Sequence, residues 1–167
     1  MSNNTRDQFN DLLRSEGLNA GIIPVSNIPN EESRLNEVNR LGILNRDLDQ
    51  EAQYNALTQL AAIITKSQIG LINILGSNIQ QCKTNFGFNV LESTLTEEMP
   101  REISICQYSL ASPQEPLIIN DLFLDERTKH FKKLEAYENL RFYAGSPLIS
   151  SRGCLLYTSP SPRDLAV

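Results

Sequence analysis

The stretch RFYAGSPL, residues 141–148, lies in a predicted β-strand that runs from Arg141 to Ser150. Gly145 and Pro147 in this stretch indicate a bend or a sheet edge. Successive side chains of a strand point to opposite faces, so Arg141, Tyr143 and Gly145 share one face. The stretch therefore predicts a strand that presents polar groups to one side of a sheet.

The segments before this strand predict the rest of the sheet. Residues 68–75 are rich in Ile and Leu, which is typical of a buried strand, and residues 79–86 alternate as its partner after a short Gly-Ser-Asn turn. This hairpin must be antiparallel. Residues 116–120 predict a further short strand, and residues 103–110 predict a helix. Together these elements predict an α+β fold, an antiparallel sheet with helices packed on it.

Two helices are predicted before the first strand. Asn30 has the character of an N-cap, acidic residues follow it, and Gly42 ends the helical pattern. A second helix is predicted over residues 49–65. Residues 1–29 are polar and predict an N-terminal extension, a short helix followed by a linker. The apolar face of the second helix consists of Tyr54, Leu57, Leu60, Ala61 and Ile64.

Composition excludes several classes of function. The net charge is −5 over 167 residues, without a basic cluster, which disfavours nucleic acid and anionic membranes as partners. No apolar run has the length of a membrane span and the N-terminus is no signal peptide, so we expect a cytoplasmic protein. Cys82, Cys106 and the single histidine, His130, do not form a zinc or disulfide pattern. The sequence gives no indication of a metal, haem or bilin.

The end of the chain differs from the rest. Residues 154–164 match what one reading frame of a transposon-type sequencing adapter encodes. Such segments are excluded from fold reasoning. We therefore expect residues 154–167 to be a non-native tail, with residues 159–167 exposed and irregular because Pro160 and Pro162 disfavour regular structure.

Six segments carry a family resemblance: RLGIL (40–44), IGLINIL (69–75), KTNFG (83–87), PREISIC (100–106), EPLIIND (115–121) and RFYAGSPL (141–148). Together they resemble GAF domains, which are small-molecule sensor domains of bacterial signalling proteins. The resemblance covers about residues 34–153 and implies a GAF domain over residues 30–153. It also implies an antiparallel sheet flanked by helices, incomplete at its C-terminus because the tail replaces the last strand.

The resemblance, with strand alternation, selects six candidate pocket residues and no catalytic residue. Cys106 is either a redox or chromophore site or a small buried apolar residue. Arg101 either pairs with an anionic ligand or holds its loop to Glu102 or Asp121. Tyr108 stands where the family usually has a histidine. The six candidates are Arg101, Cys106, Tyr108, Asp121, Arg141 and Tyr143.

The resemblance implies a sensory input module whose ligand biases an attached output domain. The expected parent is a sensor histidine kinase, with the chain itself carrying no enzymatic activity and the output domain missing. The first alternative is an input module for cyclic di-GMP synthesis or hydrolysis. The second is a ligand-free dimerisation module, which pairs through flanking helices such as Glu31–Leu41. The last is a free-standing redox enzyme that uses Cys106.

Overall fold

The sheet is built around a hairpin of two strands, β1 (Gly70–Leu75) and β2 (Ile79–Phe86). They pair antiparallel, as predicted, with Gly70 opposite Phe86 and Leu75 opposite Gln80. The structure is a computed structural model, and it describes residues 3–45, 52–87, 97–134, 137 and 140–160. Gly87 ends β2 with a φ of +89°, and a side chain there would meet the carbonyl oxygen of Gln68.

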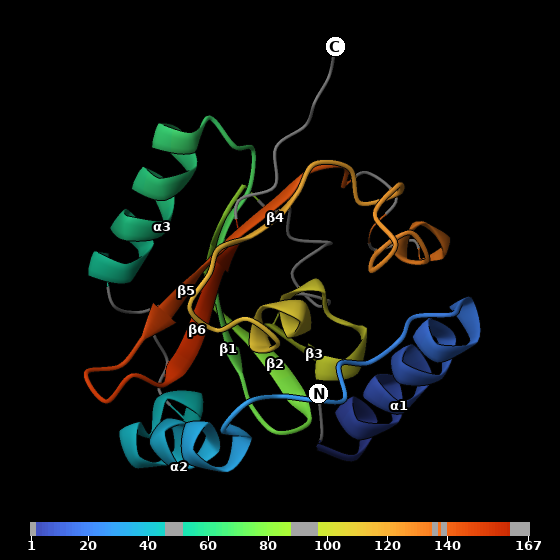
Figure 1. Cartoon of the computed structure of the whole chain (residues 1–167), viewed down its shortest axis with the longest axis horizontal. Coiled ribbons are helices and arrows are strands. Elements are labelled where there is room, and N and C mark those ends of the chain that lie inside the picture. The colour runs from blue at the N-terminus through green and yellow to red at the C-terminus, as the bar shows by residue number, and fades with distance from the viewer. Residues whose placement is uncertain (1–2, 46–51, 88–96, 135–136, 138–139, 161–167) are drawn as a thin grey trace.

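Six strands form one antiparallel sheet in the order β3-β2-β1-β6-β5-β4 (Figure 1). The predicted strands over 116–120 and 141–150 are confirmed as β4 (Leu117–Ile119) and β5 (Tyr143–Ile149), which pair with each other. β3 (Glu98–Pro100) was not among the predicted strands, and it pairs with β2. A three-residue strand carries too little periodicity to be recognised in the sequence.

β6 (Leu155–Pro160) corrects two sequence predictions. The last strand position of the sheet is filled by this chain, and residues 159–160 are in a strand, whereas we expected an irregular tail and a missing strand. β6 lies between β1 and β5, where Ile74 pairs with Tyr157 and Pro147 with Thr158. Strand pairing relies on backbone hydrogen bonds, which every residue except proline can donate and accept. A segment whose sequence did not predict a strand can therefore occupy this place. The rest of the predicted irregular segment, residues 161–167, lies outside the described residues.

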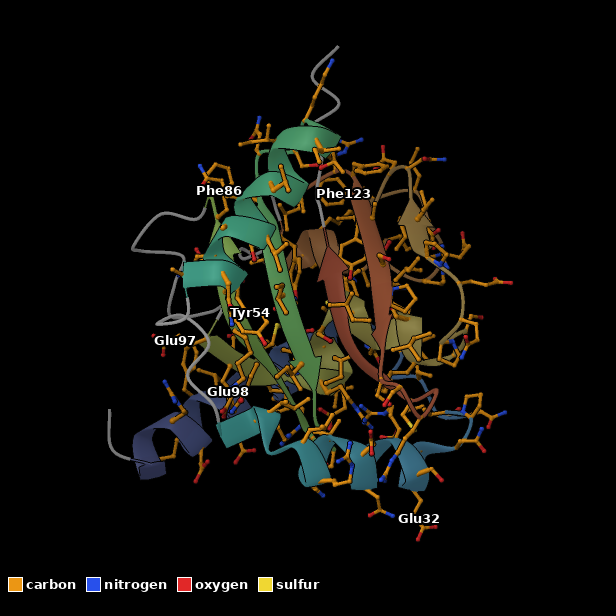
Figure 2. The ribbon with its side chains drawn as sticks, turned by 90° about the vertical axis from the view of Figure 1, so that its left-hand side faces the viewer. Glu32, Tyr54, Phe86, Glu97, Glu98 and Phe123 are labelled. Atoms are coloured by element: carbon orange, nitrogen blue, oxygen red, sulfur yellow. The ribbon has the colours of Figure 1, made fainter. Side chains whose placement is uncertain are left out.

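Helices cover both faces of the sheet. Figure 2 shows α2 (Glu31–Leu41) and α3 (Ala52–Thr65) in front of one face. The other face carries α1 (Asn3–Ala20) and short 3₁₀ helices (Figure 1). α2 begins and ends where the sequence predicted, and Gly42 caps it with a φ of +62°. The 3₁₀ helices of the α1 face are η2 (Arg101–Ile103), η3 (Ile105–Leu110) and η4 (Phe131–Lys133). A further 3₁₀ helix, η1 (Ile43–Asn45), follows α2 and packs with it through Ile43 and Val38.

The predicted apolar face of α3 does not face the sheet. Thr58 and Ala62 are buried against it, whereas Leu57, Leu60 and Ile64 are 57%, 51% and 69% exposed. A side chain at Gly70 would stand 2.8 Å from the Thr58 carbonyl oxygen, so helix and strand approach closely. Small residues permit this approach, and periodicity alone does not show which face meets the sheet.

The N-terminal extension is part of the fold. α1 spans 18 residues and is longer than the short helix we predicted, and Ile22, in the expected linker, is 3% exposed in the main core. The predicted helix over 103–110 is two 3₁₀ helices separated by Ser104, which has an extended backbone. The main core therefore lies between the sheet, η2, η3 and the N-terminal segment. Its buried members include Leu75, Ile103, Cys106, Leu117, Phe131 and Tyr143.

Candidate functional site

A buried polar group lies on the core side of the sheet, around the thiol of Cys106. The hydroxyl of Tyr143 on β5 donates to Cys106 Sγ at 3.1 Å, and Asn73 Nδ2 on β1 donates to the same sulfur at 3.4 Å. Cys106, Tyr143 and Asn73 are 3%, 4% and 1% exposed. Gly145 leaves room for this contact, because a side chain there would stand 2.8 Å from the Tyr143 hydroxyl.

A second sulfur is bound in the same manner. The hydroxyl of Tyr137 donates toward Met99 Sδ at 3.6 Å and toward the Ile103 carbonyl oxygen at 3.3 Å. Gln80 Nε2 donates to Met99 Sδ at 3.8 Å. Burial raises the pKa of Tyr137 far above its ordinary range, so its hydroxyl stays neutral.

In both groups the amide oxygen has no hydrogen-bond partner. Asn73 Oδ1 and Gln80 Oε1 are buried and unpartnered, and so is the hydroxyl of Ser109 on η3. Sulfur is a weak acceptor, so the hydrogen bonds that Asn73 and Gln80 donate to it are weak. Buried polar atoms are nearly always hydrogen-bonded. The core side of the sheet therefore holds unused capacity for hydrogen bonds with a polar molecule.

A cleft of about 210 Å³ lies beside this region. Ser109 and Leu117 line it, and Leu117 also belongs to the core cluster that contains Cys106 and Tyr143. The remaining lining residues are polar or at the rim of β4. They are Tyr108, Ser112, Glu115, Pro116, Ile118 and Arg127.

Tyr108 borders the cleft and has structural contacts of its own. Its hydroxyl is 2.7 Å from the Arg127 carbonyl oxygen and 3.3 Å from that of Ile23, so it links η3 to the N-terminal segment. Its ring packs edge-on against Phe131. Burial raises the pKa of Tyr108 to about 12. A neutral phenol thus stands at the position for which the resemblance implied a histidine.

Asp121 and Arg141 are brought together, but away from the buried sulfur groups. Arg141 binds both carboxylate oxygens of Asp121, and its guanidinium lies 4.8 Å from the centre of the Phe123 ring. The hydrogen bond from Arg141 and the N–H of Phe123 hold the pKa of Asp121 below its ordinary value. Arg141 is 48% exposed. The pair joins the ends of β4 and β5.

Arg101 binds Glu31 and the β1–β2 turn rather than the predicted partners Glu102 or Asp121. Its Nη1 binds Glu31 Oε1 at 2.6 Å and the Gly76 carbonyl oxygen at 2.9 Å. Arg34 binds the same carboxylate through Nε at 2.6 Å, and donates to the Leu75 carbonyl oxygen at 2.5 Å. This cluster ties α2 to the β1–β2 turn and to η2.

The structure thus separates the six candidates into four places. Cys106 and Tyr143 meet in the core, Tyr108 borders the cleft, Asp121 pairs with Arg141, and Arg101 joins the Glu31 cluster. Sequence reasoning missed three polar residues of the core side. One signal was available, since a buried strand reading GLINIL contains a single polar side chain. The missed residues are Asn73, Gln80 and Ser109.

Two further features of the described residues bear on function. No group of three or more His, Cys, Asp or Glu side chains in this part of the chain could hold a metal ion. No described helix has both the length and the hydropathy needed to span a bilayer. The chemistry that these residues do offer is recognition by neutral hydrogen-bonding groups, with Glu115 and Arg127 at the mouth of the cleft.

No family model matches the chain. It is similar to a cyclic di-GMP phosphodiesterase from Pseudomonas aeruginosa, with 27% identity over 147 residues, which is 82% of this chain. Those residues are 24% of the relative, so the chain spans about a quarter of the length of the curated protein it matches.

Solved structures share the fold. The GAF domain region of a Geobacter sulfurreducens protein matches with a TM-score of 0.54 at 15% identity, covering 73% of this chain and 80% of that one. A domain of a protein described as a two-component sensor histidine kinase, from Sinorhizobium meliloti, matches with a TM-score of 0.50 at 14% identity. That match covers 69% of this chain and 74% of the other. The chain therefore has the fold of GAF domains.

Proposed function

We propose that this chain is a sensory input module of a bacterial signal-transduction protein. The observation that carries the proposal is a GAF fold whose core side holds unpartnered polar atoms beside a cleft. A small molecule bound there would contact η3 and the sheet at once. We expect the module to act in the cytoplasm.

The route from this site to a flanking helix runs through η2. Arg101 on η2 binds Glu31 at the start of α2, and only Ser104 separates η2 from η3. A shift of η3 on ligand binding would therefore change the position of α2 on the sheet. Such coupling needs a ligand that binds the protein more tightly when α2 is in one position than when it is in the other.

For the output we propose a histidine kinase, as the sequence led us to expect. The support is the shared fold with the Sinorhizobium meliloti domain. A specific observation favours a second candidate, an enzyme of cyclic di-GMP turnover, because the phosphodiesterase relative aligns over 82% of this chain.

One experiment separates these outputs. The complete parent protein, expressed from the genomic reading frame, is assayed for ATP-dependent autophosphorylation and for cyclic di-GMP hydrolysis or synthesis. Radiolabel retained on the protein supports the kinase, and turnover of cyclic di-GMP supports the second candidate. A parent protein that shows neither activity would contradict both candidates. The input role is tested in the same protein by deleting residues 1–153, which should abolish any response to added metabolites and leave basal output measurable.

We also propose that the module pairs with a second copy. The sequence suggested α2 as the pairing helix, but its Arg34, Glu37 and Val38 are buried within the chain. α3 is the better surface, because it has no charged residue and exposes four large apolar side chains. They are Leu57, Leu60, Ile63 and Ile64. A domain that dimerises and responds to no ligand would favour the ligand-free dimerisation module instead.

A further inference from the structure

We infer that the core side binds a small neutral molecule that carries both a hydrogen-bond donor and an acceptor, such as a carboxamide, lactam or urea. The inference rests on the proposed sensory function and adds the chemical class of the ligand. It starts from the unpartnered atoms Asn73 Oδ1 and Ser109 Oγ, whose residues are both 1% exposed.

These atoms lie on a path that leads from the cleft inward. Side chains three residues apart in a 3₁₀ helix eclipse each other, so Cys106 and Ser109 share one side of η3. Ser109 lines the cleft, and Cys106 touches Asn73 at the inner end. η3 therefore links the cleft, which Ser109 lines, to the buried amide of Asn73, which Cys106 contacts.

Two hydrogen bonds at the inner end are made to sulfur, which is a weak acceptor. The Tyr143 hydroxyl and the Asn73 amide both donate to a sulfur, at 3.1 and 3.4 Å. An oxygen acceptor on a ligand would bind the same donors more strongly than sulfur does. In either orientation of the Asn73 amide, one of its polar atoms remains unpartnered. A ligand with a donor and an acceptor side by side satisfies both orientations.

Charge is excluded by burial. Among the described residues, the buried charged side chains are Arg34 and Glu37, both on α2, and the charged residues that line the cleft are Glu115 and Arg127. Arg127 is already bound by Asp125 through Nε and Nη2. An ion moved past them would lose its hydration without gaining a counter-charge. The site should therefore select against anions and cations of the same shape.

Three probes of nearly equal shape test this selection. Benzamide is neutral and has a donor and an acceptor, benzoate is an anion, and benzamidinium is a cation. Binding to the full 167-residue chain is measured by ligand-observed nuclear magnetic resonance. We expect benzamide to bind with a dissociation constant in the millimolar range, as befits a fragment, and both ions to bind at least about tenfold more weakly.

Two variants locate the binding. Asn73→Leu keeps the side-chain size and removes the amide, and it should weaken benzamide binding by about tenfold. Ser109→Ala is a smaller change that leaves the core packed, and it should weaken binding by about fivefold. Asn36→Leu, at an exposed position on α2, is the matched control and should leave binding unchanged. Circular dichroism confirms that each variant is folded.

Equal binding of benzamide and benzoate, no binding of benzamide, or unchanged affinity in the folded Ser109→Ala variant would overturn the inference. The proposed function fails separately. If benzamide binds as expected but no metabolite alters the output of the parent protein, the ligand class stands and the sensory role is wrong. If a charged metabolite alone drives the output, the sensory role stands and the ligand class is wrong.

Discussion

Arg101 and Glu31 form an ion pair although they lie 70 positions apart, with Nη1 2.6 Å from Oε1. Their side chains are only 17% and 24% exposed. The pair fastens η2, on the core side of the sheet, to the first turn of α2. Removing it tests whether this contact stabilises the fold.

Arg101→Ala should lower the free energy of unfolding by about 2 kcal/mol, because it removes a partly buried, charge-assisted hydrogen bond. Urea denaturation measures the change. Arg6→Ala is the control, since its pair with Glu97 is 45% and 64% exposed and should contribute less than about 1 kcal/mol. Equal losses in the two variants would show that Arg101 has only a surface role.

The same carboxylate predicts a pH dependence. Burial alone raises the pKa of Glu31, but hydrogen bonds from Arg34 and Arg101 outweigh it and leave the pKa below the ordinary 4.5. A lowered pKa in the folded state stabilises the protein above pH 4.5, and this stabilisation is lost as the pH falls through the folded value. In Glu31→Gln the loss of stability below pH 4.5 should therefore be shallower. An unchanged acid profile would contradict the assignment.

Gly145→Ala should disturb the buried thiol group. The new Cβ would stand 2.8 Å from the Tyr143 hydroxyl, so the ring must move away from Cys106. We expect a loss of about 1–3 kcal/mol, as for overpacked cores. Adding Tyr143→Phe removes the clashing oxygen and should recover part of the loss. Ser146→Ala, at an exposed position on β5, is the control, and additivity of the two core changes would argue against the clash.

The exposed face of α3 predicts the oligomeric state. The chain should sediment as a dimer at micromolar concentration, and Leu60→Glu with Ile64→Glu should make it a monomer, because charges would enter an apolar contact. Leu124→Glu is the matched control, since Leu124 is 76% exposed elsewhere on the chain. A monomeric parent chain, or a dimer that survives both changes, would contradict pairing through α3.

Shortening the chain to residues 1–153 should abolish cooperative unfolding, because β6 then no longer bridges β1 and β5. The edges left by its loss are open to aggregation. A chain of residues 1–160 should keep the cooperative transition. Cooperative melting of residues 1–153 would show that β6 adds nothing to the fold.

We still propose that residues 154–167 derive from an adapter, so that the natural gene encodes a different strand in the place of β6. Sequencing the source genome across codon 153 tests this. A genome that encodes residues 154–164 as they stand here would contradict it, and the strand would then be native.

Much of the sheet could be predicted from local pattern. The hairpin β1–β2, the strand β5 and the limits of α2 follow from alternation, turn residues and Gly42, because these signals act over a few residues. The contact of Cys106 with Tyr143 could not be predicted, because the two residues are 37 positions apart. It depends on how η3 packs against β5. Each residue was a candidate alone, but nothing local joins them.

The sequence by itself determined that this chain has an α+β fold with a central antiparallel hairpin. The reason is that the spacing of apolar residues typical of strands and of helices can be recognised within a few neighbouring residues. Tertiary structure decided which face of α3 is buried, that Arg101 binds Glu31, and that Asn73 Oδ1 and Ser109 Oγ lack hydrogen-bond partners. These properties depend on distances between segments far apart in the chain. Periodicity shows that a helix has an apolar face, but only packing shows whether that face meets the sheet or remains available to a partner.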